Sequence, residues 1–229
     1  MSQDFGDLVN DLWESILANR GGLERDTCII YLRSSAQKLL FAEKRLESLT
    51  DQIKECAKRF EDKRELDLFY IEMNFDHCVS SLRSSLEHLA QLINAVIPLN
   101  LSPRFAGGET PVTLRNVIKE MQSNRLSISN ETLACLSSFL ISEIEKRWYK
   151  ELNELRTEIF HEKFNRFAWT SLATLNRKLL DFKILVPNGT AKSLKTESER
   201  EVSYFCKNMV QNVDNVLRES FFALIKYLR

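Results

Sequence analysis

The chain has 229 residues with 32 basic and 32 acidic side chains, so no net charge attracts it to nucleic acid or to a membrane surface. Six glycines and four prolines leave few turns and favour long helices over an all-β fold. The apolar runs are short, and residues 1–4 lack the basic start of a signal peptide, so no membrane segment is expected. These properties predict an all-α protein of the cytoplasm that buries a sizeable core.

The five cysteines are odd in number, widely scattered and never at CxxC spacing, which argues against a disulfide framework and against a structural zinc site. We expect no metal ion and no cofactor. Each cysteine neighbours apolar residues, so all are predicted to be buried free thiols in a reducing compartment. They are Cys28, Cys56, Cys78, Cys135 and Cys206.

Apolar residues at helical spacing predict a single bundle of about five to seven helices. The expected helices, in chain order, cover residues 5–18, 26–60, 68–97, 114–121, 131–167 and 199–228. The helix over 68–97 has the longest apolar stripe, and Pro98 ends it. Such a stripe needs a partner of similar length, so we expect the helix over 26–60 to pack against it in an antiparallel pair.

Two segments lack a clear helical pattern. Residues 100–111 contain prolines and glycines and are expected to form a loop. Within 168–198, residues 179–186 fit either a helix end or a short extended piece before the Pro187-Asn188-Gly189 turn. No repeat or long polar linker divides the chain, so one domain over 1–229 is predicted.

The helix over 131–167 has two apolar stripes. Helical geometry separates them by roughly 100°. One consists of Trp148, Leu152, Leu155 and Ile159, and the other of Phe160, Phe164 and Phe167. Arg156 lies between the stripes, and His161 lies on the far flank of the second. Either both stripes are internal, or one of them faces a second subunit.

Arg156 and His161 are the best candidates for chemistry. Arginine is a permanent cation that binds phosphate in a bidentate manner, and histidine transfers protons near neutral pH. The motifs of P-loop, Rossmann, HExxH and GxSxG enzymes are absent, so those reaction classes have no support. The pair instead points to a phosphodiester.

The sequence Arg156-Thr157-Glu158-Ile159-Phe160-His161, after an earlier long helix over 78–94, resembles the HEPN superfamily. The resemblance covers roughly residues 65–229 and leaves 1–62 as an N-terminal helical extension. It implies a helical bundle, a homodimer and a metal-independent RNase of a toxin–antitoxin, CRISPR or anti-phage system. Active members often carry Asn, Asp or His after the arginine, whereas this chain has Thr157. The alternative is therefore a catalytically silent dimerisation or interaction module.

The resemblance implies specific roles. His161 would act as general base or acid, and Arg156 would bind the scissile phosphate. An antitoxin or a nucleotidyltransferase is the expected protein partner. The expected supporting residues are Thr157, Glu158, Glu87 and Asn94, although Glu87 and Asn94 also fit a solvated helix face. The expected dimer interface is Phe160, Phe164 and Phe167. RNA would bind to Lys163, Arg166, Arg177 and Lys178, although interspersed acidic residues also fit an ordinary solvated helix face.

Overall fold

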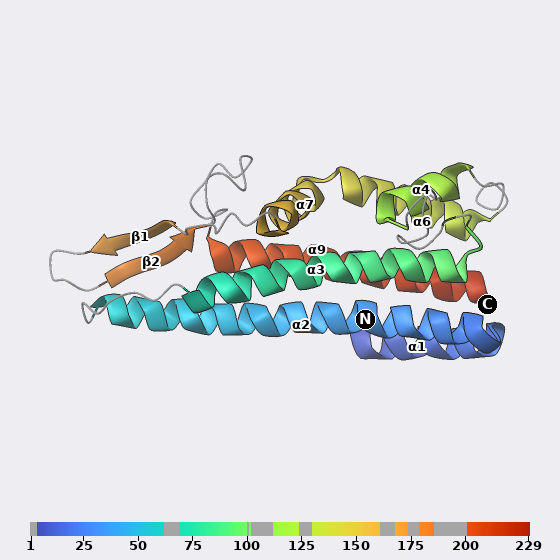
Figure 1. The fold of residues 1–229 in the computed structure, drawn as a ribbon, viewed down its shortest axis with the longest axis horizontal. Helices are drawn as coiled ribbons and strands as arrows, with labels where there is room; N and C mark the ends of the chain where they lie inside the picture. The colour runs from blue at the N-terminus through green and yellow to red at the C-terminus, as the bar shows by residue number, and fades with distance from the viewer. Residues whose placement is uncertain are drawn as a thin grey trace. The chain divides into compact units, whose positions relative to one another are not determined.

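A computed structural model of the chain contains long helices and a hairpin (Figure 1). It describes residues 4–61, 69–99, 101, 112–123, 130–160, 168–173, 179–185 and 201–229, with side chains except at 60–61, 156–160, 168–173 and 179–185. The helices are α1 (Phe5–Asn19), α2 (Gly22–Glu61), α3 (Phe69–Val96), α4 (Leu114–Ser123), α6 (Glu131–Glu145), α7 (Arg147–Phe160) and α9 (Val202–Leu228). The strands are β1 (Ala168–Ala173) and β2 (Leu179–Leu185).

The all-α class is confirmed. Within the described ranges there are seven helices, and the β1–β2 hairpin is a small addition to them. None of the helices in these ranges combines the length and apolar composition that a bilayer crossing requires.

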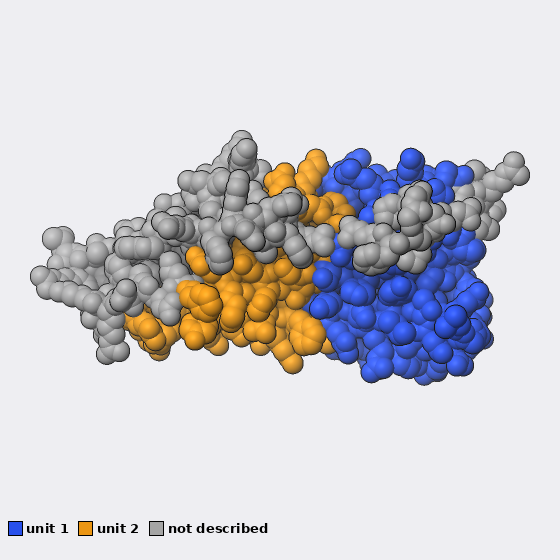
Figure 2. Space-filling model, viewed as in Figure 1, with its two compact units in different colours: residues 1–39, 84–146, 212–229 blue, residues 40–83, 147–211 orange. Residues whose placement is uncertain are grey.

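The described chain divides into two compact units, coloured blue and orange in Figure 2. Unit 1 consists of Met1–Leu39, Ser84–Lys146 and Asn212–Arg229. Unit 2 consists of Leu40–Arg83 and Arg147–Gln211. Helices α2, α3 and α9 each contribute one portion to unit 1 and another to unit 2. The expected single domain with an extension over 1–62 stays a prediction.

The connection between α1 and α2 is shorter than the sequence predicted. Asp4 caps α1 by accepting a hydrogen bond from the Gly6 backbone N–H, and Arg20 ends the helix in an extended conformation. Gly22 has a φ of 53°, which glycine adopts without a Cβ clash, and α2 begins there. The prediction that this helix starts near residue 26 was therefore wrong by about one turn.

The antiparallel pairing of α2 and α3 follows from contacts in unit 1. The rings of Tyr31 and His88 lie 6.4 Å apart, and one turn further along α2 the hydroxyl of Ser35 donates to the Ser85 carbonyl. Positions rise along α2 while they fall along α3, so the two helices run in opposite directions. The apolar stripe of α3 is buried as predicted, from Ile71 to Val96.

The predicted long helix over 131–167 is broken at Lys146. This residue has a ψ of 152°, which is extended, and its Nζ lies 2.6 Å from the buried Glu143 carboxylate. The buried face of α6 includes Leu136 and Leu140, whereas that of α7 includes Leu152. In one straight helix these faces would point about 90° apart. The break lets each helix bury its own apolar face.

The extended alternative for residues 179–186 is confirmed over Leu179–Leu185, and residue 186 lies outside the described residues. β2 pairs with β1 in an antiparallel hairpin in which Trp169 lies opposite Ile184, and the register shifts between Leu172 and Ala173. The predicted inward positions of the last helix are all buried on α9: Val202, Phe205, Met209, Val213, Val216, Leu224 and Leu228.

Four of the five cysteines are buried as predicted, but Cys135 is exposed on α6. The error arose because Leu133 and Leu136, its near neighbours in sequence, point into the core while position 135 lies on another side of the helix. In unit 2 a hydrogen bond with the Cys78 thiol, together with burial, raises the pKa of the Cys206 thiol well above its usual range.

Candidate functional site

Helix α7 carries the arginine of the candidate motif on a well-buried scaffold. Trp148, Leu152 and Leu155 are buried, as predicted for the first apolar stripe. Arg156 belongs to the last turn of the helix, and so do Thr157, Glu158 and Phe160, although the side chains of all four lie outside the description. The packing of the preceding turns therefore holds the backbone of the motif arginine in a helix.

The remaining motif and surface candidates lie outside the described residues. They are His161, Lys163, Phe164, Arg166, Phe167, Arg177 and Lys178. Their predicted roles in proton transfer, RNA binding and dimerisation stay predictions.

A second face of α7 includes the motif arginine. Tyr149, Asn153 and Arg156 follow the i, i+4, i+7 spacing that places residues on one side of a helix. Asn153 Nδ2 donates to the Tyr149 carbonyl oxygen at 2.9 Å, along this face. Tyr149 itself is buried. This face is next to the first apolar stripe of α7. Its first residue, Tyr149, is buried, and its last residue, Arg156, belongs to the motif.

Arg83 of α3 reaches this face within unit 2. Its guanidinium carbon lies 5.8 Å from the centre of the Tyr149 ring, and its Nη1 lies 3.4 Å from the Tyr149 hydroxyl oxygen. A cation over an aromatic ring is an attractive arrangement that strengthens as water is excluded. Tyr149 was not predicted from the sequence, and its spacing to Arg156 was the available signal.

The first turn of α7 also buries a charge. Arg147 Nε lies 2.7 Å from a Glu151 carboxylate oxygen, one turn further along the helix. Glu151 is buried, and a buried carboxylate needs such a partner because an unpaired charge that is removed from water is strongly destabilising. The pair fixes the start of the helix.

The predicted supporting residues Glu87 and Asn94 belong to unit 1, whereas Arg156 belongs to unit 2. A shared site therefore stays a prediction. Asn94 Nδ2 donates to the Leu101 carbonyl oxygen at 3.4 Å, and Arg20 donates to the Val96 carbonyl oxygen close by. Arg20 satisfies a carbonyl group at the C-terminal end of α3, and Asn94 binds a residue that follows this helix, so both interactions have a structural role.

Asp76 is the carboxyl group with the most unusual environment on α3. Burial raises its pKa to about 6, and the negative charge of Glu72, one turn away, acts in the same direction. It lines a small hollow of about 180 Å³ with Phe69, Met73 and His77. A carboxyl with this pKa is partly protonated in weak acid, which makes it sensitive to pH.

Across the described ranges, no three His, Cys, Asp or Glu side chains are grouped so that they could hold a metal ion. In a comparison with known proteins, no family model, curated protein or solved structure matches this chain.

Proposed function

We propose that this protein is a HEPN-like, metal-independent endoribonuclease, or an RNA-binding component, of a bacterial stress or defence system of the toxin–antitoxin type. The observation that carries the proposal is the place of Arg156 in the last turn of α7. His161 follows it by five positions, Tyr149 lies on the same face of α7, and Arg83 of α3 contacts the Tyr149 ring.

The chemistry of the proposal needs only these side chains. His161 removes the proton from a ribose 2′-hydroxyl, or donates one to the leaving oxygen, because histidine is the side chain suited to proton transfer near neutral pH. Arg156 binds the scissile phosphate and stabilises the charge that develops on it. The products carry a 2′,3′-cyclic phosphate and a 5′-hydroxyl.

The proposal includes the surroundings of the site. Lys163, Arg166, Arg177 and Lys178 form the RNA-binding rim, with Thr157, Glu158, Glu87 and Asn94 as supporting groups. The protein acts in the cytoplasm, and an antitoxin or nucleotidyltransferase controls it. Two copies join through Phe160, Phe164 and Phe167, which brings both Arg156–His161 pairs to one shared active-site cleft.

The decisive experiment is incubation with a varied set of RNAs in EDTA. We expect wild-type protein to cleave, and the variants His161→Ala and Arg156→Ala to lose cleavage by at least about a hundredfold. The matched control is His77→Ala, which removes an exposed histidine of α3 and should leave the rate unchanged. If no RNA is cleaved by wild-type protein, the RNase proposal fails.

The second candidate function is a catalytically silent interaction module. Thr157 favours it, because active HEPN proteins often carry Asn, Asp or His at the position after the arginine. An exposed groove with an apolar centre between α6 and α9 also favours it, since such a surface is typical of protein contacts. Failure of RNA cleavage with intact self-association selects this alternative.

The role of the phenylalanine ridge has its own test. Phe164→Glu should give a folded protein that lacks both association through the ridge and RNase activity, because a charge is costly in an apolar interface. Circular dichroism and sedimentation distinguish this result from unfolding. An unfolded variant would place the ridge in the core instead.

A further inference from the structure

A groove lies between α6 and α9 in unit 1. It has a volume of about 460 Å³, and positions from about two turns of each helix line it. The centre is apolar or neutral: Cys135 and Leu136 come from α6, and Phe222 and Ala223 come from α9. Phe222 is 38% exposed, and Cys135 is the exposed cysteine. Part of the apolar centre therefore faces water.

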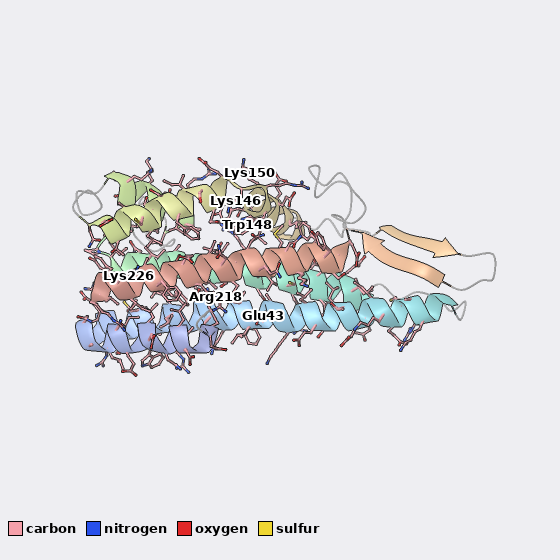
Figure 3. All side chains as sticks on the ribbon, turned by 180° about the vertical axis from the view of Figure 1, so that it is seen from behind. Glu43, Lys146, Trp148, Lys150, Arg218 and Lys226 are labelled. Atoms are coloured by element: carbon pink, nitrogen blue, oxygen red, sulfur yellow. The ribbon has the colours of Figure 1, made fainter. Side chains whose placement is uncertain are left out.

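Charged side chains stand at the ends of the groove. On α9, Glu219 and Lys226 are two turns apart and lie on either side of the central Phe222. On α6, Glu131 lies at one end and Phe139 at the other. No ion pair joins Glu131, Glu219 or Lys226 to another residue in the described part of the chain. Lys226 is labelled on α9 in Figure 3.

This distribution of charge is complementary to itself. A two-fold axis that lies in the surface and crosses both helices near Cys135 and Phe222 would pair each helix with its own copy in antiparallel orientation. Lys226 of one copy would then face Glu219 of the other, and the reciprocal pair would form at the opposite end. The two apolar centres would cover each other, and the two Cys135 thiols would lie near the axis.

We propose that the α6–α9 groove is a self-association surface whose occupant is the same groove of a second copy of this chain. The apolar centre supplies the attraction, because its burial removes Phe222 from water. The Lys226–Glu219 pairs set the antiparallel register, which is the usual role of charges at the rim of an interface.

This surface is separate from the Phe160, Phe164 and Phe167 ridge of the proposed function. It consists of other residues, on α6 and α9, and it requires neither RNA nor catalysis. Association through the groove should therefore persist in Phe164→Glu and in His161→Ala. Loss of RNase activity leaves this inference intact, and loss of groove pairing leaves the RNase proposal intact.

Cys135 provides a direct probe, because the other four cysteines are buried. A short bis-maleimide added to the native protein should link two chains into a covalent dimer at micromolar concentration. Cys135→Ser should abolish the link, which assigns it to the groove. A wild-type protein that stays unlinked, or one that links equally well when Phe222 is changed to Ser, overturns the proposal.

The charge pairs give a sharper test through exchange of sign. Lys226→Glu and Glu219→Lys should each reduce the rate of linking by about tenfold, since each places like charges opposite each other at both ends. The double variant Glu219→Lys/Lys226→Glu restores opposite charges and should restore the wild-type rate. Lys207→Glu, an exposed change elsewhere on α9, is the matched control and should have no effect. A double variant that stays as slow as the single variants would rule out the two-fold pairing.

Discussion

Ser35 of α2 and Ser85 of α3 donate their hydroxyl groups to each other's backbone carbonyl oxygens. The distances are 3.0 Å from Ser35 Oγ to the Ser85 oxygen and 2.8 Å from Ser85 Oγ to the Ser35 oxygen. Both residues have 0% exposure. Serine is small enough to let two helix backbones approach, and the exchanged hydrogen bonds keep both buried hydroxyls satisfied.

Removal of either hydroxyl should destabilise the fold. Ser35→Ala and Ser85→Ala should each lower the free energy of unfolding by about 1 kcal/mol, because each removes one buried hydrogen bond. The double variant should depart from the sum by about 0.5 kcal/mol or more, since the two serines are in direct contact. Urea titration measures these values. Ser48→Ala is the control, because Ser48 is exposed and donates only to Lys44 of its own helix, and it should stay within about 0.5 kcal/mol of wild type.

The raised pKa of Asp76 predicts a stability that falls as pH rises. The protonated carboxyl is favoured in the folded state, with a pKa of about 6 against an ordinary value of 3.8. The folded state therefore binds the proton more tightly, and stability is lost between about pH 4 and pH 6. Asp76→Asn should raise the free energy of unfolding by about 1–3 kcal/mol at pH 8 and change little at pH 4.

Two variants check the origin of this effect. Glu72→Gln should move the loss of stability to lower pH, because it removes the neighbouring negative charge. Asp51→Asn alters a carboxylate that is 75% exposed and should change stability by less than about 0.5 kcal/mol at either pH. If Asp76→Asn changed the free energy of unfolding equally at pH 4 and pH 8, the raised pKa of Asp76 would be contradicted.

The contact between Arg83 and Tyr149 predicts a measurable coupling energy. A double-mutant cycle with Arg83→Met and Tyr149→Leu should give about 1 kcal/mol, because burial of the ring limits screening by water. The matched cycle uses Arg33 and Trp13, with the guanidinium 5.6 Å from the ring centre. Arg33 is exposed, so that coupling should be smaller. Equal couplings in the two cycles would show that burial of the Tyr149 ring has no influence.

The cysteines predict a simple thiol count. Native protein should react with an aromatic disulfide reagent at Cys135 alone, and unfolded protein should react at all five positions. Burial also raises the pKa of the Cys28 thiol, which lowers the fraction of reactive thiolate. Cys135→Ser should abolish the fast reaction. A second thiol that reacts rapidly in the native state would contradict the burial of the other four.

The spacing of apolar residues predicts the helices that bury one continuous stripe. Leu8, Leu12 and Ile16 on α1 and the repeating positions of α3 and α9 are all buried, because a helix with a single apolar stripe has one favourable orientation against a core. Asn130 caps α6 from the preceding position, where its side chain accepts a hydrogen bond from the Leu133 N–H at 3.2 Å. These features depend on residues within a few turns of one another.

Other features depend on which distant segment covers each face, and spacing along the chain does not encode that. Helical propensity continues through Lys146, yet the helix is interrupted there, so that α6 and α7 each bury their own apolar face. Cys135 is apolar by type but exposed, while Tyr149 is buried against Arg83, which is distant in sequence. The amino-acid pattern was sufficient to predict the helices with one continuous apolar stripe and the position of Arg156 on a helix. Tertiary packing decided what lies opposite each helix face, because the burial of a side chain is a property of its neighbours in space.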